Sequence, residues 1–443
     1  MKTIIPAADN VIKLLGKAKT SENYRMMHYV VSEEVEDGVL LFHTLTREML
    51  LLSKEEYERL FDLPELYEKW FIVPEETNDR KLTDQIRFTL RAMQKKPEHI
   101  KGYTIFTTTE CNARCFYCFE KGARHYPMSE ETALKTVEFI AAHCGGEPVK
   151  LRWFGGEPLY NAKVIDIITN GLKEKGIEFR SSMTTNGYLF DDDSMKRATE
   201  LWNLRWVQIT LDGTEEVYNQ TKNYIYSNNT SPFETVLDNI GRCIENQIYV
   251  SIRLNVSATN ADDLMELVRQ LYNRFGTTKY LGVYSAMLFH IAKKADTENE
   301  RTYEKQRELD SIIRKYGLQI RHYISRKMKL NYCQADNDGS VTVLPDGKLG
   351  ACEDYSDFGF IGDIWSNTID NQARSDYKEC YPSIPECTVC FYYPECIRLK
   401  KCNSLSLCTL THRDKVLTET KERMINSLHR TDNSEEKTDE GNC

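Results

Sequence analysis

Three cysteines in one short run are the residues best placed to do chemistry. Cys111, Cys115 and Cys118 lie in Thr-Thr-Thr-Glu-Cys-Asn-Ala-Arg-Cys-Phe-Tyr-Cys-Phe-Glu, with three and then two residues between them. This spacing is typical of an iron–sulfur cluster that leaves one iron without a protein ligand. Such an iron can bind a small molecule and pass it an electron. We therefore expect redox chemistry at this run.

Zinc is the alternative metal for the same cysteines. Structural zinc sites are usually closed by two pairs of ligands around a tetrahedron, and no fourth ligand lies near Cys118 in the sequence. The aromatic residues Phe116, Tyr117 and Phe119 surround the thiols, and they would shield a low-potential cluster from water. The cluster is therefore the preferred interpretation.

A second group of cysteines lies toward the C-terminus. Its members are Cys333, Cys352, Cys380, Cys387, Cys390, Cys396, Cys402 and Cys408. Eight thiolates are what two tetracysteine iron–sulfur clusters need. Two structural zinc ions would need as many, so spacing alone leaves that alternative open.

The bulk composition is that of a globular protein. The chain has 443 residues, of which 28% are charged and 41% hydrophobic, and its net charge is −9. This acidic balance argues against a nucleic-acid partner. We find no signal peptide and no stretch long enough to span a bilayer, so we expect a cytoplasmic protein that has no membrane partner. In that reducing compartment the 14 cysteines indicate metal binding rather than disulfides.

The middle of the chain alternates strands and helices. The expected strands are 103–108, 149–154, 178–184, 205–211, 248–256 and 279–289. Ser231-Pro232-Phe233-Glu234 predicts one helix start, and Asn260 is expected to cap another helix. Six βα units predict an α/β fold with a parallel sheet, either open or curved into a partial barrel. Ligands in such folds gather at the C-terminal ends of the strands, and the cysteine run follows the first strand.

The two ends of the chain have different patterns. Short strands are expected at Met27–Val31, Val39–Phe42 and Met49–Leu52, then a capping box at Ser53 and a helix over 82–93, which together suggest a winged-helix-like unit. Residues 341–350 predict a hairpin with a Pro-Asp-Gly turn. The segment from Thr431 is polar and charged, and we expect it to be disordered.

Three further segments lie at the ends of expected strands. Gly155-Gly156-Glu157-Pro158 follows the second strand, and its glycines let the backbone approach a ligand while Glu157 adds a carboxylate. Thr184-Thr185-Asn186-Gly187 ends the third strand and Thr210-Leu211-Asp212-Gly213 the fourth. With the cysteine run, these segments resemble in order those of radical S-adenosylmethionine (SAM) enzymes.

This resemblance implies a partial (β/α)6 TIM-like barrel and two cofactors. Cys111, Cys115 and Cys118 would hold a [4Fe–4S] cluster whose open iron binds SAM. Where the family commonly has an arginine that grips the SAM carboxylate, this chain has Lys222, which lacks the bidentate fork, so Arg253 on the fifth strand is an alternative. The implied SAM-binding residues are Tyr117, Gly155, Gly156, Glu157, Thr185, Asn186, Thr210, Lys222 and Arg253.

The C-terminal cysteines resemble the SPASM extension, which carries auxiliary iron–sulfur clusters in radical SAM enzymes that act on peptides. The resemblance implies one auxiliary cluster on Cys333, Cys352 and Cys402, either with Cys380 as its fourth ligand or with an open iron. The other cluster would be held by Cys387, Cys390, Cys396 and Cys408. Glu353 follows Cys352 at the place where related sulfatase-maturing enzymes have a proton-accepting aspartate, so it is the candidate catalytic base.

The N-terminal unit resembles, in shape and position, the recognition element of enzymes that modify ribosomally made peptides (RiPPs). Such a unit binds a leader peptide as an added strand at its sheet edge. The expected domains are therefore 1–95 for leader binding, 96–316 for the radical SAM core, 317–415 for the SPASM extension, and 416–443 as a helical and then disordered tail.

Together these resemblances imply a radical SAM peptide maturase. A 5'-deoxyadenosyl radical would remove hydrogen from a precursor peptide, and a thioether or carbon–carbon crosslink would follow. The implied partners are the precursor peptide with its leader and an external electron donor such as flavodoxin or ferredoxin. The alternatives are a maturase that makes formylglycine in a sulfatase, and a zinc-binding regulatory protein that is not an enzyme.

Overall fold

The fold was analysed on a computed structural model, which does not describe every residue. The described residues are 1–17, 21–118, 120, 125–225, 230–288, 297–331, 333–354, 359–380, 382–396, 399–402, 408 and 410–430. Phe119 and the segment from Thr431, for which we expected disorder, lie outside these ranges.

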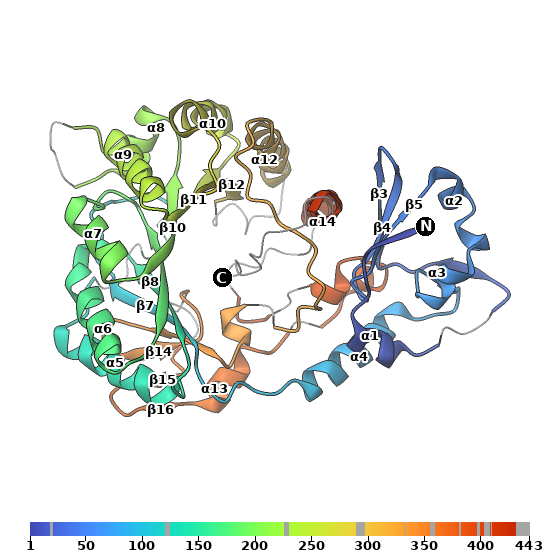
Figure 1. The fold of residues 1–443 in the computed structure, drawn as a ribbon, viewed down its shortest axis with the longest axis horizontal. Helices are drawn as coiled ribbons and strands as arrows, with labels where there is room; N and C mark the ends of the chain where they lie inside the picture. The colour runs from blue at the N-terminus through green and yellow to red at the C-terminus, as the bar shows by residue number, and fades with distance from the viewer. Residues whose placement is uncertain are drawn as a thin grey trace.

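Six parallel strands form the curved sheet at one side of the molecule (Figure 1), in the spatial order β12-β11-β10-β9-β8-β7. The strands are β7 (Gly102–Thr108), β8 (Val149–Gly155), β9 (Phe179–Thr185), β10 (Leu204–Leu211), β11 (Tyr249–Val256) and β12 (Leu281–Met287). Every strand expected in this region is present, with ends shifted by one or two residues. The α/β class and the partial barrel are therefore confirmed.

Helices cover the convex side of this sheet (Figure 1). They are α5 (Glu130–His143), α6 (Ala162–Glu174), α7 (Asp192–Glu200), α8 (Glu215–Lys222), α9 (Pro232–Glu245), α10 (Ala261–Phe275) and α12 (Thr297–Lys315). The helix α9 begins after Ser231 with Pro232 at its first position, as expected. Asn260 precedes α10, but its side chain makes no capping hydrogen bond, so that expectation is wrong in detail. The side-chain amide donates instead to the main-chain oxygens of Asp212 and Asn255.

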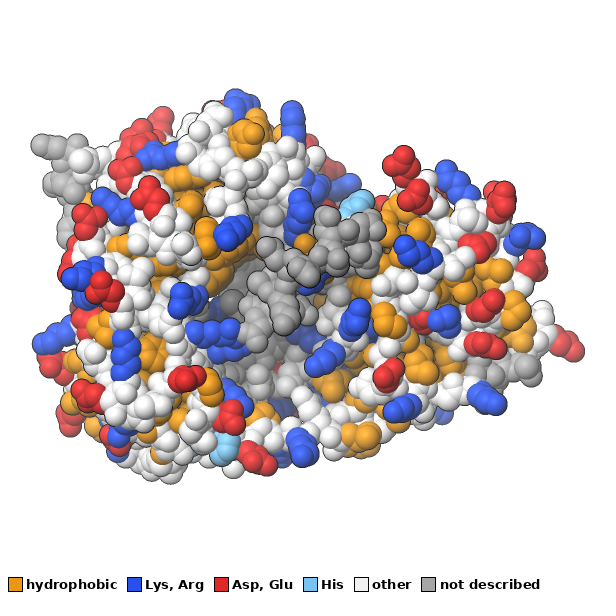
Figure 2. All heavy atoms as spheres, in the orientation of Figure 1, with side chains coloured by type: hydrophobic (Ala, Val, Ile, Leu, Met, Phe, Trp, Pro, Cys, Tyr) orange, Lys and Arg blue, Asp and Glu red, His pale blue; other side chains and the backbone are white. Residues whose placement is uncertain are grey.

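The two faces of the sheet differ because successive side chains of a strand point to opposite sides. On β10, Val207, Ile209 and Leu211 are buried in the hydrophobic core under the helices. Gln208 and Thr210 alternate with them and are only partly buried. Polar side chains thus line the concave face, and Figure 2 shows a hollow in the centre of the molecule with basic side chains along its barrel wall.

A C-terminal hairpin extends the barrel sheet beyond β7. β13 (Ser340–Val343) runs parallel to β7, and β14 (Lys348–Gly350) returns antiparallel to β13, so the expected Pro-Asp-Gly hairpin is present. Two short strands, β15 (Gly362–Asp363) and β16 (Thr368–Ile369), complete a sheet of ten strands among the described residues, and the short helix α13 (Asn371–Asp376) follows. The sheet therefore continues across the expected boundary at residue 316.

The N-terminal part is a small sheet with helices. Its four-stranded antiparallel sheet has the order β1-β5-β4-β3. The elements are β1 (Lys2–Ile5), α1 (Asp9–Leu15), β2 (Tyr24–Met26), β3 (Val30–Val35), β4 (Gly38–His43), β5 (Met49–Leu52), α2 (Lys54–Glu58), α3 (Pro64–Glu68), β6 (Ile72–Pro74) and α4 (Asp79–Met93). The Ser53 capping box is confirmed, with both reciprocal hydrogen bonds present.

Two expectations for the N-terminal part were incomplete. The strand expected from Met27 begins at Val30, because the N–H of Val30 donates to the oxygen of Met27 and closes a turn there. The first strand, β1, was not expected, and it pairs with β5. The two edge strands of this sheet are therefore β1 and β3.

The N-terminal part rests on the C-terminal segments. Ile4, Phe42 and other residues of its sheet share a hydrophobic cluster with Ile324 and Met424. Met424 lies on α14 (Leu410–Arg430), which stands between the barrel and the N-terminal sheet (Figure 1). The tail helix therefore begins before the expected residue 416. None of the described helices has the length and apolar character needed to cross a membrane.

Candidate active site

The cysteine run lies directly after β7, at the C-terminal end of the barrel strands. Cys111, Cys115 and Cys118 are all partly buried. Burial raises the pKa of the Cys111 thiol to about 12, and nearby Glu157 and the other two thiols add to that effect. A positively charged centre among these sulfurs would remove the cost of ionising them.

The donor set after β7 fits an iron–sulfur cluster. Three cysteines of one loop are the set that a [4Fe–4S] cluster with one open iron takes, and all three thiols are partly buried. Within the described ranges, no group of three or more His, Cys, Asp or Glu side chains is arranged as a site for a single metal ion.

Hydrogen bonds from two other segments hold the cysteine run in place. The N–H of Arg114 donates to the oxygen of Lys222 at 2.8 Å, and the N–H of Ile225 donates to the oxygen of Asn112 at 2.9 Å. The side-chain amide of Asn186 donates to Oδ1 of Asn112 at 2.7 Å and lies 3.9 Å from Sγ of Cys111. The ends of α8 and β9 thus fix the conformation of this loop.

The glycines after β8 are required by a close approach of two main chains. A Cβ on Gly155, whose φ is +123°, would lie 2.0 Å from the oxygen of Thr108. A Cβ on Gly156 would lie 2.3 Å from the oxygen of Glu110. We expected these glycines to make room for a ligand, and the structure shows that they make room for the residues just before Cys111.

Changing Gly156 to alanine is therefore expected to displace the cysteine run. The new methyl group meets main-chain atoms that cannot rotate away, and such overpacking typically costs about 1–3 kcal/mol. We expect a lower thermal midpoint and less iron bound per chain after anaerobic reconstitution. Gly241→Ala is the control, because its methyl group would meet only Phe275, at 3.7 Å, and alanine favours the helix α9. Equal iron content in the two variants would contradict this account.

Glu157 joins the ends of two strands. Its carboxylate is fully buried and accepts hydrogen bonds from Oγ1 of Thr185 at 2.7 Å, from the N–H of Asn186 at 2.8 Å and from the N–H of Leu159 at 3.1 Å. Burial raises the pKa of Glu157, and these hydrogen bonds oppose the rise. The Glu157 side chain therefore holds the ends of β8 and β9 together, and its two oxygens accept hydrogen bonds from the protein itself.

Thr210 and Arg253 lie side by side on the concave face. They are register partners on the parallel strands β10 and β11. Both are partly buried, and Nε of Arg253 donates to Oδ1 of Asn255 at 3.0 Å. A hydroxyl and a guanidinium are thus adjacent near the strand ends.

Lys222 lies in a buried polar triangle with two other side chains. Its Nζ is 3.0 Å from Oδ2 of Asp212 and 3.0 Å from the hydroxyl of Tyr117. The Tyr117 hydroxyl also donates to Oδ2 of Asp212 at 2.8 Å. Tyr117 itself lies between Cys115 and Cys118 in the loop, so the triangle is attached to the cysteine run.

The C-terminal cysteines fall into two groups. Burial raises the pKa of Cys333, and nearby Cys402 adds to the rise. Burial also raises the pKa of Cys352, with a further contribution from nearby Cys333. The pKa of Cys390 is likewise raised by burial first and then by nearby Cys408 and Cys387. Cys396 lies near Tyr392 beside the second group, and Sγ of Cys380 lies 3.6 Å from the oxygen of Lys378. The first group therefore brings together three of the cysteines assigned to one auxiliary cluster, and the second group three of those assigned to the other.

Glu353 faces the barrel. Its Oε1 lies 3.5 Å from Nη1 of Arg152, and its Oε2 lies 3.7 Å from Sγ of Cys352. Arg152 stands on β8 on the side opposite the buried Leu151 and Trp153, so it belongs to the concave face. The candidate base is thus placed inside the barrel wall.

Four residues that contribute to the site had been assigned no role from the sequence. Asn112 and Asp212 belong to the segments singled out above, and each is buried and hydrogen-bonded. Asn255 donates to Oδ1 of Asp212 at 3.0 Å, and Arg152 pairs with Glu353. Asp212 could have been singled out from the sequence, because it lies in the same strand-end segment as Thr210. A carboxylate that becomes buried there needs a cation beside it.

Comparison with known proteins agrees with this geometry. Residues 105–271 match the model of the Radical SAM superfamily. A GTP 3',8-cyclase of Clostridium perfringens is 29% identical over 299 residues, which are 64% of this chain and 90% of that protein. The sporulation killing factor maturation protein SkfB of Bacillus subtilis is 27% identical over 194 residues, 40% of this chain and 43% of that protein.

A solved structure shares the fold. It is the enzyme anSMEcpe with bound AdoMet and Cp18Cys peptide, with a TM-score of 0.54 and 16% identity over 75% of this chain and 99% of that one. The superfamily match covers most of the barrel that carries the cysteine run, and it supports an enzyme whose cofactors are a [4Fe–4S] cluster and SAM. The non-enzymatic zinc alternative is therefore set aside.

Proposed function

We propose that this radical SAM enzyme modifies a ribosomally synthesised precursor peptide and introduces a thioether or carbon–carbon crosslink. The observation that carries the proposal is a groove beside the open edge strand β3 of the N-terminal part. SkfB, a relative by sequence, is named as a maturation protein.

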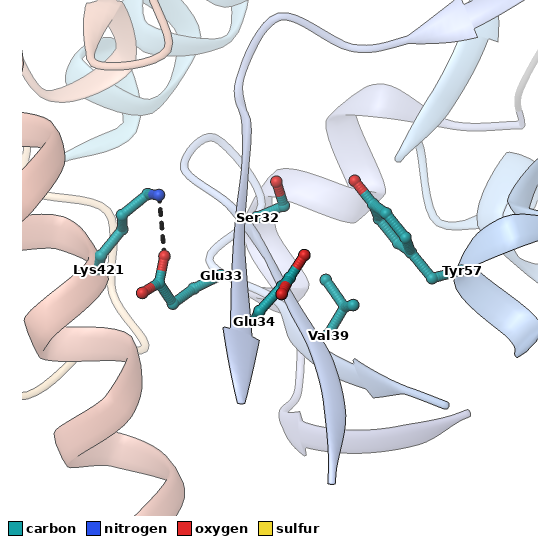
Figure 3. Close-up of a pocket in the computed structure, with 6 residues that line it drawn as sticks. All are labelled: Ser32, Glu33, Glu34, Val39, Tyr57 and Lys421. Atoms are coloured by element: carbon teal, nitrogen blue, oxygen red, sulfur yellow. Dashed lines mark ion pairs between the residues drawn. The ribbon is translucent and has the colours of Figure 1, made fainter. Parts of the chain in front are cut away.

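The groove has walls from three separate segments of the chain. It has a volume of about 330 Å³ and is lined by Ser32, Glu33, Glu34, Val39, Tyr57 and Lys421 (Figure 3). Tyr57 of α2 lies on one side of β3, and Lys421 of α14 lies on the other, where it pairs with Glu33 at 2.8 Å. The groove lies in the N-terminal part rather than at the cysteine run.

The register of β3 leaves main-chain groups available in this groove. Val35 pairs with Gly38 across a two-residue turn, so the hydrogen-bonded pairs are Val35–Gly38, Glu33–Leu40 and Val31–Phe42. The N–H and C=O groups of Ser32 and Glu34 therefore point away from β4. An extended peptide can pair with them as an added strand, and the carboxylate of Glu34 favours a basic side chain in that peptide.

The barrel residues would hold the cofactors as follows. Cys111, Cys115 and Cys118 ligate the cluster, and the ends of β8 to β11 bind SAM, with Thr210 and Arg253 directed to its carboxylate. When bound, the cluster and SAM together supply a one-electron cleavage that yields a hydrogen-abstracting radical. The chain's own part is to orient the peptide and to exclude water along the concave face.

The C-terminal part would serve the second half of the reaction. The eight cysteines would hold two auxiliary clusters, which would supply an acceptor for the electron that remains after bond formation. Glu353, held near Arg152, is placed to take the proton released as the new bond forms. An external donor such as flavodoxin or ferredoxin supplies the first electron.

The proposal is tested with the full chain after anaerobic iron reconstitution. It is incubated with SAM, a strong reductant and each candidate precursor peptide that the open reading frames beside its gene encode, and the products are analysed by mass spectrometry. We expect 5'-deoxyadenosine and a peptide that has lost two hydrogens. A chain that binds zinc and no iron, or that consumes GTP and leaves the peptide unchanged, would contradict the proposal.

A further inference from the structure

We propose that Lys222 is a positioning residue that holds the cysteine run through Tyr117, and that Arg253 alone grips the SAM carboxylate. This inference rests on the proposed function only in that SAM and a cluster are bound. It gives the two cations of the site different roles. Lys222 stands where the family commonly has an arginine that grips the SAM carboxylate, but here it would hold the loop instead.

The surroundings of Lys222 leave it little capacity for a ligand. Its side chain is only 4% exposed, and two of the three N–H donors of its ammonium group are engaged by Asp212 and by the Tyr117 hydroxyl. The rings of Tyr117 and Tyr218 each lie 5.7 Å from Nζ. Burial alone would lower the pKa of Lys222, but Asp212 and then Tyr117 raise it well above its usual value. The charge is thus already paired inside the protein.

The same lysine is connected to the cysteine run at two points. Its side chain reaches Tyr117, which separates Cys115 from Cys118, and its main-chain oxygen accepts from the N–H of Arg114. A residue that contacts the loop on both sides of Cys115 determines where that sulfur lies. Moving Nζ toward a ligand would break the contact with Tyr117 and leave Asp212 as a buried unpaired carboxylate, which is costly.

Arg253 has the opposite character. It stands on the concave face beside Thr210, and among the described residues its guanidinium is engaged at Nε alone, by Asn255. The two terminal nitrogens of its guanidinium can make the parallel pair of hydrogen bonds that a carboxylate accepts. Asn255 links the two cations, since its other end donates to Asp212 at 3.0 Å. The network thus keeps Lys222 on Asp212 and directs Arg253 outward.

The test compares Lys222→Met, the double variant Lys222→Met/Asp212→Asn, and Arg253→Met with the wild-type enzyme. For each reconstituted protein we measure iron per chain, the electron paramagnetic resonance spectrum of the reduced cluster without SAM, and the Kd for SAM. We expect Lys222→Met to lose iron and to alter the spectrum, while its loaded fraction binds SAM with nearly the wild-type Kd. We expect Arg253→Met to keep the iron and the spectrum, and to weaken SAM binding about 10- to 100-fold.

The double variant separates positioning from misfolding. Because it removes both charges, no orphan carboxylate remains, and we expect it to regain much of the iron that Lys222→Met loses. Lys222→Met with normal iron and spectrum but SAM binding about 10-fold weaker would overturn the inference, as would an unchanged Kd in Arg253→Met. A wild-type enzyme that binds neither iron nor SAM would instead refute the proposed function itself.

Discussion

A Cys115→Ala variant is expected to release no 5'-deoxyadenosine above background when it is given SAM and a strong reductant. Three thiols are the smallest set that can hold a cluster with one open iron, so the loss of one removes a ligand that nothing else in the loop replaces. Changes to residues that merely support metal ligands cost about 10- to 100-fold, and loss of a ligand should cost more. Deoxyadenosine is measured by liquid chromatography after anaerobic incubation.

The matched control is Cys243→Ala. Cys243 is fully buried in the helix α9 and belongs to the core under the barrel, away from the cysteine run. Its replacement removes one small apolar atom and should leave both iron content and deoxyadenosine release close to wild type. If Cys115→Ala released deoxyadenosine at the wild-type rate, the assignment of Cys111, Cys115 and Cys118 to the cluster would be wrong.

The barrel could be predicted from the sequence because its signals are local. The strands of the middle region are short and alternate with helical stretches, one of which has a clear start signal at Ser231 and Pro232, so six βα units are visible without any long-range information. The hairpin at 341–350 was visible for the same reason. Its pairing with β7 was not, because Ser340 and Gly102 are far apart in the chain and nothing in either segment specifies the other.

The sequence identified the candidate ligands of the site but not the contacts that surround them. Cysteine spacing reveals the thiols, since their chemistry is carried by residue type. The roles of Gly155 and Gly156 depend on how closely the main chain of 108–110 passes, and this distance appears only in three dimensions. In the same way the sequence shows that Lys222 is a cation, while the contact with Asp212 decides whether that cation is available to a ligand.

The groove beside β3 is the feature that sequence analysis was least able to predict. Its lining comes from β3, from Tyr57 of α2 and from Lys421 near the other end of the chain. The sequence suggested an added strand at a sheet edge, but it could not show which edge lies beside a groove. The structure has two edge strands in this sheet, β1 and β3, and the groove lies beside β3.

A Ser32→Pro variant is expected to lose modification of the precursor peptide while it keeps the cleavage of SAM. Proline lacks the N–H that Ser32 directs away from β4, and its ring would occupy the place of the added strand. The ladder between β3 and β4 does not use that N–H, because Glu33 and Val31 form its hydrogen-bonded pairs. Peptide affinity is measured by fluorescence anisotropy with a labelled leader, and modification by mass spectrometry.

Ser32→Ala is the control that isolates the main chain. It removes the side-chain hydroxyl at the same position and leaves the N–H in place, so an added strand can still pair with β3. The Ser32→Ala variant should therefore bind the leader within a few-fold of wild type. The Ser32→Pro variant should bind it about 10-fold or more weakly, because the lost hydrogen bond and the steric conflict act together. If both variants bound the leader equally well, the peptide would have to dock elsewhere, and the groove between Tyr57 and Lys421 would need another occupant.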